Sequence, residues 1–404
     1  MKQGWEIKRL EDEVEFQRGL TYSKKDEVDF SDNIVLRSNN VDLIKNELDF
    51  TELKYINPAI EVQESKKVKK GSLLICTANG SKSHLGKVAL IDDDYNYAFG
   101  GFMGQITPKQ KLDSKFLFYL MTSDKYKKFI NELSDGANIN NLKFSDLGQF
   151  EIPLPPLPEQ QRIVSILDEA FAAIAKAKAN AEQNLKNAKE LFESYLQGLF
   201  EKKGDGWEEK TLGQLCVFTQ GIQRDVKLQS KTEGKNQVRF LRIVDYTQGN
   251  EPPRYIDFPG EKYILNTDDV ALVRYGSTGF VCRGLEGALA NNLFRVIPKS
   301  TEKLTNDFLF IYLNSLLFQN VIKATMNGAA MPAISFGLIE EITFPLPPIK
   351  AQQTIVRQVD ALRTETQKLE AGYQKKIDDF EELKKSILQK AFAGELKTEK
   401  AVAV

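Results

Sequence analysis

The sequence is short of the residues from which most catalytic and metal centres are built. It has 404 residues but only three cysteines and one histidine. Cys76, Cys216 and Cys282 lie far apart, which excludes a disulfide framework and a CxxC metal site. A single histidine, His84, excludes a multi-histidine metal site. A proton-transfer role for His84 would need a nucleophile or carboxylate partner, and none is evident.

Long apolar runs and an excess of one charge are also missing. No stretch approaches the roughly 18 consecutive apolar residues of a membrane span, and the N-terminal MKQGWEIKRLEDE lacks an apolar signal-peptide core. We therefore expect a cytoplasmic protein. With 55 basic and 56 acidic residues the net charge is −1, so binding to nucleic acid by charge alone is not expected. A basic face balanced by acidic surface elsewhere remains compatible with these numbers.

Familiar catalytic motifs are absent. The glycine-rich segment at 99–104 lacks the GxGxxG order of a dinucleotide site, and the segment at 275–279 has no Walker lysine. A faint carboxylate–lysine set that could hold magnesium for a nuclease consists of Asp32 or Asp49 with Glu52 and Lys54. Chance explains this set better in a chain rich in glutamate and lysine, because the second half of the chain has no counterpart.

The chain contains an internal repeat. GWEIKRLEDEVEFQRG, which begins at Gly4, matches GWEEKTLGQLCVFTQG, which begins at Gly206, at an offset of 202 residues. Further along, IPLPPLPEQQRIV at 152–164 matches FPLPPIKAQQTIV at 344–356, at an offset of 192. A repeat of this length predicts two structurally equivalent halves.

Each half is predicted to contain a globular segment followed by a long helix. The globular segments alternate short apolar runs with glycine-rich turns, which predicts an α+β fold with a sizeable sheet. Proline clusters mark the joins, because proline ends one element and stiffens the entry to the next. The predicted division is a first globular domain at 1–155, a central helix at 156–203, a second globular domain at 204–347, a C-terminal helix at 348–397 and a tail at 398–404.

Apolar residues in the two helical segments recur with heptad spacing, which predicts a two-helix coiled coil. Ordinary amphipathic core helices are the alternative, but about 65 Å of helix exceeds the usual globular length and favours a spacer. An approximate twofold relation between the halves would make the helices antiparallel. Lys178 is the one charged member and is expected to fix the register. The predicted seam residues are Leu167, Phe171, Ile174, Lys178, Leu185, Phe192, Tyr195, Tyr373, Phe380 and Ile387.

The loops of both globular segments place short polar and basic residues beside glycine. Arginine or lysine can bridge guanine, asparagine can bridge adenine, and lysine, serine and threonine hold phosphates. A solvated loop is the simpler interpretation of any one such residue, but two sets at equivalent positions favour DNA contact. The candidates are Lys24, Lys25, Asn79, Ser81, Lys82, His84, Lys87, Asn138 and Asn140 in the first half, and Arg224, Lys227, Arg274, Tyr275, Ser277, Thr278, Arg283 and Asn292 in the second.

The repeated PLPPLxxQQxIV motif, which opens a long helix after a globular segment begun by GWxxxxL, resembles the specificity subunits of type I restriction–modification enzymes. The second copy departs from the motif at Lys350 and Ala351. The resemblance implies two target-recognition domains, one for each half of a two-part DNA target. It also implies spacer helices that dock partner subunits. The middles of the two domains differ strongly, which predicts an asymmetric target.

The resemblance further implies that this chain is not itself an enzyme and holds no cofactor. Methyl transfer and DNA cleavage would reside in two modification (methyltransferase) subunits and in restriction (translocase and nuclease) subunits. S-adenosylmethionine, ATP and magnesium are expected on those partners. The recognition loops vary within the family, so it supplies no base-contact residue for this chain.

Two other functions remain open at this point. A stand-alone nuclease or methyltransferase would modify DNA without partners. A coiled-coil adaptor that binds only protein would recognise no defined DNA sequence even with its partner.

Overall fold

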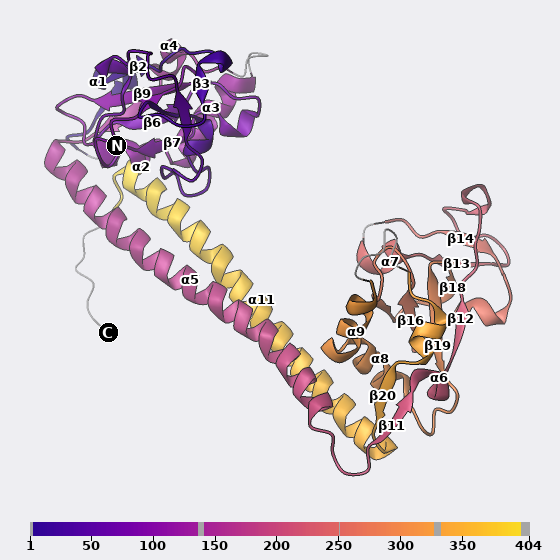
Figure 1. Cartoon of the computed structure of the whole chain (residues 1–404). Coiled ribbons are helices and arrows are strands. Elements are labelled where there is room, and N and C mark those ends of the chain that lie inside the picture. The colour runs from indigo at the N-terminus through magenta and orange to yellow at the C-terminus, as the bar shows by residue number, and fades with distance from the viewer. Residues whose placement is uncertain (1–2, 136–140, 250, 327–332, 397–404) are drawn as a thin grey trace, which may run out of the picture. The chain divides into compact units, whose positions relative to one another are not determined.

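The chain folds into two compact units (Figure 1). The computed structural model describes residues 3–135, 141–249, 251–326 and 333–396. Unit 1 consists of Met1–Ala181 with Lys375–Val404, and unit 2 consists of Glu182–Gln374. The two long helices, α5 (Leu157–Glu201) and α11 (Ile349–Ala393), each contribute to both units. Each unit therefore combines one globular segment with a piece of both helices.

The globular part of unit 1 contains three small sheets. The largely buried antiparallel sheet has the order β2 (Val14–Arg18), β9 (Met103–Pro108), β6 (Leu73–Cys76), β7 (Val88–Leu90). The second has the order β3 (Glu27–Val28), β5 (Lys54–Ile56), β4 (Ile34–Leu36), β8 (Ala98–Phe99), with β4 and β8 parallel. The third pairs β1 (Glu6–Arg9) with β10 (Glu151–Leu154), and the helices are α1 (Leu10–Glu13), α2 (Ser114–Leu120), α3 (Asp124–Asp135) and α4 (Phe144–Leu147).

Unit 2 repeats this plan. Its first sheet has the order β12 (Cys216–Gln220), β19 (Leu293–Pro298), β16 (Val270–Val273), β17 (Val281–Cys282). Its second has the order β14 (Tyr255–Asp257), β13 (Gln237–Leu241), β18 (Gly287–Leu289), β15 (Ile264–Leu265), again with one parallel pair, β13 and β18. β11 (Glu208–Thr211) pairs with β20 (Thr343–Leu346), and the helices are α6 (Leu212–Leu215), α7 (Ile243–Thr247), α8 (Asn306–Asn314), α9 (Leu316–Met326) and α10 (Phe336–Glu340). The expected α+β fold with an internal repeat is confirmed.

The matching glycines of the repeat, Gly19 and Gly221, stand where two segments of backbone almost touch. A Cβ atom at Gly19 would lie 2.0 Å from the Gly100 carbonyl oxygen, and one at Gly221 would lie 2.1 Å from the Ala290 carbonyl oxygen. Only glycine tolerates such an approach. In both units the chain that leaves β2 or β12 is therefore pressed against the turn that follows the parallel strand, β8 or β18.

The two long helices form part of the core of both units. In unit 1, Ile163 and Leu167 of α5 and Leu388 of α11 are buried with the side chains of α2. In unit 2, Phe200 of α5 and Val359 of α11 are buried with those of α8. Burial at these positions ties each globular segment to the helix pair of its own unit.

The first glutamine of each QQ motif locks the start of the long helix. Gln160 is fully buried. Its Oε1 accepts a hydrogen bond from the Asp113 backbone N at 2.8 Å, and its Nε2 donates to the carbonyls of Lys111 and Pro155 at 2.9 and 2.8 Å. Gln352 makes the same three bonds in unit 2, to Thr305 N, Lys303 O and Pro347 O. The motif found in the sequence is thus a main-chain lock.

The helices run antiparallel within each unit, as predicted. In unit 1, Lys178 forms an ion pair with Glu381, and the Lys384 ammonium lies 5.2 Å from the centre of the Phe171 ring. Residue numbers therefore rise along α5 as they fall along α11. In unit 2, the Tyr195 hydroxyl donates to Gln358 at 3.2 Å, while Arg363 lies 5.5 Å from the centre of the Phe192 ring, which gives the same direction.

The predicted seam residues are all buried or half-buried, and Phe171, Lys178, Phe192 and Tyr195 make the contacts with the other helix given above. Leu167 is buried, and the other nine are half-buried: Phe171, Ile174, Lys178, Leu185, Phe192, Tyr195, Tyr373, Phe380 and Ile387. Lys178, expected to be the charged member, meets a carboxylate across the seam, and this ion pair lowers the pKa of Glu381. The 45-residue helices are too polar to cross a bilayer, and no other helix in the described ranges could cross one.

Candidate nucleic-acid interface

Strand ends of unit 2 surround a concave surface with a volume of about 420 Å³. We call patch 2 six of the eight polar residues that line it: Arg224, Arg242, Arg254, Tyr275, Asn291 and Asn292. Gln223, Gln229 and three apolar residues complete the lining. The neighbouring elements α7, β13 and β14 lie at the end of unit 2 opposite to β11 and β20 (Figure 1).

Hydrogen bonds between neighbouring turns fix the backbone of patch 2. The Arg274 N donates to the Asn292 carbonyl at 2.8 Å, which joins the turn after β16 to the turn before β19. The Ala290 N donates to the Leu241 carbonyl at 2.9 Å, which places the same turn beside Arg242. Because these turns are held by main-chain bonds, their side chains project from a rigid base.

The three arginines of patch 2 differ in what holds them. Arg242 is anchored, because its Nε lies 3.0 Å from the buried carboxylate of Asp245 and its Nη2 donates to the Pro252 carbonyl at 3.0 Å. Among the described residues, Arg224 and Arg254 have no carboxylate partner. Two guanidinium groups are therefore available to an anionic ligand, beside one that the protein holds in place.

Strand pairing identifies the corresponding residues of unit 1. Leu36 pairs with Phe99 as Leu241 pairs with Leu289, so the turn at Gly100–Met103 corresponds to the turn at Ala290–Leu293. Val35 and Phe240 are likewise equivalent. Val35 pairs with Lys54, and the Phe240 N donates to the Arg254 carbonyl, so Lys54 corresponds to Arg254. The counterparts of Arg224, Arg242, Arg254, Tyr275, Asn291 and Asn292 are Tyr22, Arg37, Lys54, Ala78, Gly101 and Phe102, which we call patch 1.

The two patches retain a cation at two positions and differ at the others. Arg37 corresponds to Arg242, and Lys54 corresponds to Arg254. In patch 1 it is Lys54 that is held, with its Nζ 2.7 Å from Glu27, and this ammonium lowers the pKa of the Glu27 carboxyl. The Arg37 Nε is buried without a hydrogen-bond partner, and Arg37 has no carboxylate partner in the described ranges. At the two positions where both patches carry a cation, each patch thus has one guanidinium without a carboxylate partner among the described residues, Arg37 in patch 1 and Arg254 in patch 2.

The structure brings some of the predicted residues together and separates others. Arg224, Tyr275 and Asn292 meet in patch 2. Lys24 and Lys25 are exposed on a 3-10 turn that follows Tyr22, and Lys227 is exposed on the corresponding turn of unit 2. Other predicted residues follow or adjoin patch residues in the sequence. Asn79 donates to Ser38 Oγ, and Arg274 Nε donates to the Ile334 carbonyl. Ser81, Lys82 and Ser277 are exposed, and Thr278 is half-buried.

Lys87 is not available for contact in this arrangement. It is only 6% exposed, and its Nζ donates to the Val41 carbonyl at 2.8 Å. Burial lowers the pKa of Lys87. Half-buried His84 has a pKa that is lowered by burial and by the Lys87 charge, and its Nδ1 is buried without a partner. The predicted candidates Asn138 and Asn140 lie outside the described residues.

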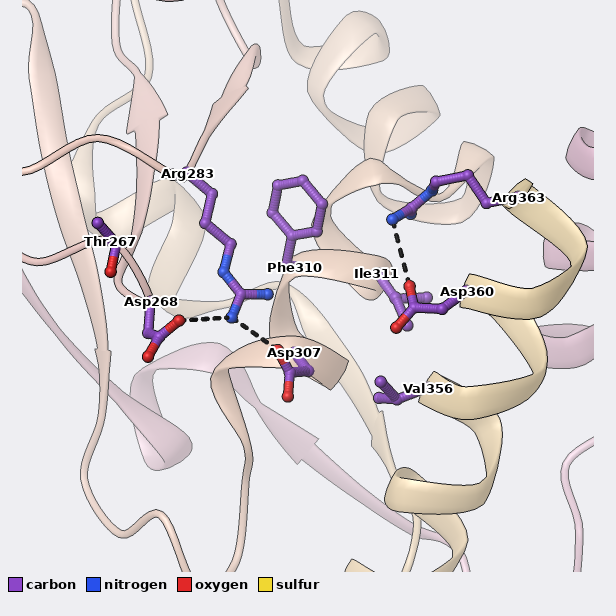
Figure 2. Close-up of a pocket in the computed structure, with 10 residues that line it drawn as sticks. Thr267, Asp268, Arg283, Asp307, Phe310, Ile311, Val356, Asp360 and Arg363 are labelled. Carbon is purple, nitrogen blue, oxygen red and sulfur yellow. Dashed lines mark hydrogen bonds and ion pairs between the residues drawn. The ribbon is translucent and has the colours of Figure 1, made fainter. Parts of the chain in front are cut away.

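Arg283 lies at a different place, beside α11 (Figure 2). Its Nη2 is 2.6 Å from Asp307 and 3.6 Å from Asp268. The ring of Phe310 stands between Arg283 and Arg363, at 5.6 and 6.0 Å from their guanidinium carbons, in a cavity of about 320 Å³. The contacts of Arg283 are with Asp268 and with Asp307 and Phe310 of α8, and Arg363 of α11 approaches the same ring, so Arg283 lies apart from patch 2.

The faint nuclease set is not assembled. Lys54 pairs with Glu27, while Asp49 accepts a hydrogen bond from the Thr51 backbone N. Over the described ranges, no group of three or more histidine, cysteine, aspartate or glutamate residues is placed to hold a metal ion.

Sequence reasoning missed Arg254, Arg37, Lys54 and Phe102 as members of the patches. The repeat alignment could have found them only with the strand register in hand. The offset between the halves changes from 202 to 192 residues between the two matching motifs, so the residues in between cannot be aligned by a constant shift.

Two equivalent α+β modules that carry polar loops, joined by a pair of long antiparallel helices, define a two-module recognition protein. Residues 2–186 and 204–379 both match the family described as the type I restriction modification DNA specificity domain. The chain therefore belongs to this family and is a non-catalytic specificity subunit of a type I restriction–modification enzyme.

Similar proteins cover 98% of the chain. It is 27% identical over 424 residues to the StySPI specificity subunit of Salmonella potsdam and 28% identical over 425 residues to the EcoKI specificity subunit of Escherichia coli. Both matches cover 98% of this chain and 90% of the relative. Its fold is similar to a chain solved in a study of type I R-M complex assembly, with a TM-score of 0.79, 20% identity and coverage of 98% and 99%. It is also similar to the HsdS subunit from Thermoanaerobacter tengcongensis, with a TM-score of 0.64, 19% identity and coverage of 98% of each chain.

Proposed function

We propose that this chain reads a two-part, asymmetric double-stranded DNA target, with patch 1 on one half-site and patch 2 on the other. The observation that supports this most is the pattern of retained and changed residues between the patches. Cations are retained at Arg37 and Arg242, and at Lys54 and Arg254. Phosphate contacts fix position without carrying sequence information, which suits retained cations.

The changed positions suit base recognition. Tyr22 corresponds to Arg224, and Phe102 corresponds to Asn292. Arginine and asparagine can make paired hydrogen bonds to guanine and adenine edges, whereas phenylalanine cannot hydrogen-bond. Two patches at equivalent backbone positions with different functional groups would read different sequences, so the two half-sites should differ.

We further propose that two modification subunits dock on the long helices, one in each unit, and that restriction subunits join them. Leu191 and Leu383 are 51% and 46% exposed. They stand at equivalent positions of α5 and α11, at the repeat offset of 192 residues. An exposed leucine at the same place on both helices is suited to two copies of the same partner. S-adenosylmethionine, ATP and magnesium belong on the partner subunits in this proposal, and the assembly would work in the cytoplasm.

Exchange of residues 1–155 for the same region of a relative tests whether each domain reads its own half-site. We expect the methylated sequence to change in one half-site and to stay the same in the other, because patch 2 remains intact. Sequencing methylated positions in cells that carry the chimaera and its partner subunits measures this. Methylation that changes in both half-sites, or no defined methylated sequence with the wild-type chain, would contradict the proposed function.

Leu191→Glu is expected to reduce the number of bound modification subunits without unfolding the chain. The side chain is half exposed, so the charge costs little in the free protein but would be buried without a partner at a docked interface. Native mass spectrometry of the reconstituted complex gives the subunit count. Lys82→Ala, on an exposed turn of unit 1, serves as the control and should leave assembly intact. A full complement of modification subunits on the Leu191→Glu chain would argue against this docking surface.

A further inference from the structure

Phe102 combines an exposed ring with a rigid backbone. The side chain is 74% exposed. Its carbonyl accepts three hydrogen bonds, from Thr77 N at 2.9 Å, Thr77 Oγ1 at 3.0 Å and Ala78 N at 3.1 Å. The Met103 N closes the turn by donating to the Gly100 carbonyl at 2.8 Å. The ring is thus held out in solvent by a backbone that cannot easily withdraw it.

The surroundings of Phe102 leave room for a close approach. Gly100 and Gly101 precede it and carry no side chains, whereas unit 2 has Ala290 and Asn291 at the same positions. Among the described residues no other aromatic ring packs against Phe102, although several phenylalanines of this chain pair with one another. Single exposed apolar residues are common on protein surfaces, so the position of Phe102 in patch 1 carries the argument.

The chemistry of the ring restricts what it can read. Asn292, its counterpart in patch 2, can donate and accept hydrogen bonds at a base edge, but a phenyl ring can do neither. In the major groove the one apolar group on the base edges is the C5-methyl group of thymine, and phenylalanine is among the residues that contact it. The unpaired guanidinium of Arg37 in the same patch is available for a neighbouring phosphate.

We propose that Phe102 is a specificity-determining residue of the first recognition domain and contacts the C5-methyl group of a thymine in the first half-site. The proposal rests on the proposed function, since it assigns a base to a patch that we infer to bind DNA. It adds that the two domains use different chemistry at one position, an apolar contact in patch 1 and an amide in patch 2.

Removal of the methyl group from the DNA tests the proposal directly. Once the methylated sequence is known, duplexes are prepared in which each thymine of the first half-site is replaced, one at a time, by deoxyuridine. Methylation by the complete complex is then measured as kcat/KM for wild type, Phe102→Ala and Phe102→Leu. In wild type we expect one replacement to lower kcat/KM about fourfold, as for the loss of one buried methyl group. Phe102→Ala should be insensitive to that replacement, and Phe102→Leu should retain part of the sensitivity.

Phe30→Ala is the matched control. Phe30 is 76% exposed and lies 5.2 Å from the Tyr55 ring. Since side chains alternate along β5, Tyr55 points away from the face that carries Lys54. This variant should discriminate thymine from uracil as wild type does, and all variants should keep their second half-site.

Two results would overturn the assignment. The first is a wild-type complex that responds to no thymine of the first half-site; if Phe102→Ala then loses activity, the ring acts as a wedge or stacking surface. The second is a Phe102→Ala complex that keeps the wild-type response to uracil. Failure of the wild-type complex to modify any defined sequence would instead refute the proposed function and the assignment with it.

Discussion

Replacing Gln160 by alanine should destabilise unit 1 by about 3 kcal/mol or more. The change leaves the Asp113 N–H and the carbonyls of Lys111 and Pro155 without their partner. Each buried polar group that loses its hydrogen bond costs about 1–3 kcal/mol, and the missing amide adds a cavity. Gln161→Ala, one residue along the same helix and exposed, is the control, with an expected change within about 0.5 kcal/mol.

The two tryptophans of the chain allow this effect to be assigned to one unit. Trp5 belongs to unit 1 and Trp207 to unit 2. In a Trp207→Phe background, the fluorescence of Trp5 reports denaturant unfolding of unit 1, and a Trp5→Phe background reports unit 2. Gln160→Ala should shift mainly the Trp5 transition and Gln352→Ala mainly the Trp207 transition. Unchanged midpoints for both variants would show that the glutamines do not lock the helix starts.

Removal of the two unpaired arginines of patch 2 should cause the largest loss of DNA binding. For Arg224→Ala combined with Arg254→Ala we expect at least a tenfold loss of affinity in the complete complex. If both arginines contact phosphates, the slope of log K against log salt should also fall in magnitude by about two. Neither side chain has a carboxylate partner among the described residues, so no buried charge is left unpaired by the change.

A control with the same change in charge separates local contact from overall charge. Lys303 and Lys350 are exposed at the other end of unit 2, where Gln352 donates to the Lys303 carbonyl. Lys303→Ala with Lys350→Ala should leave affinity and the salt slope close to wild type. Equal losses for the two double variants would mean that patch 2 has no special role. Measurements at several salt concentrations, with Trp207 fluorescence to verify folding, give the comparison.

The parts of the fold that the sequence predicted are those with long regular patterns. Heptad spacing predicted residues that are buried or half-buried along both helices, because a helix repeats its face over many turns and one irregular residue changes little. The lone charged seam residue, Lys178, was predicted to fix the register, and it meets Glu381 across the helix pair. The QQ motif was visible as a repeat, but its three main-chain partners lie up to 49 residues away and leave no local signal.

The patches could be predicted only in part, because their residues come together through strand pairing. Lys87 has the right residue type and a loop position, yet its side chain turns inward to the Val41 carbonyl. Arg283 was grouped with the glycine-rich loop, yet it bonds to Asp307 near α11. Conversely, Lys54 belongs to patch 1 through its pairing with Val35. Side-chain direction and strand register decide these cases, and neither can be read from residue type.

The glutamine lock also bears on how new sequence preferences could arise. The three hydrogen bonds that Gln160 and Gln352 have in common all go to main-chain atoms of the globular segments and of the proline turns, and Gln352 also accepts one from Thr305 Oγ1 at 3.4 Å. Every residue offers the same carbonyl oxygen, whatever its side chain. The glutamine Oε1 accepts its backbone hydrogen bond from Asp113 N in one half and from Thr305 N in the other. The three shared hydrogen bonds therefore place no demand on the side chains of the attached module. A foreign module of the same backbone shape could be joined to these helices without a compensating change in either glutamine.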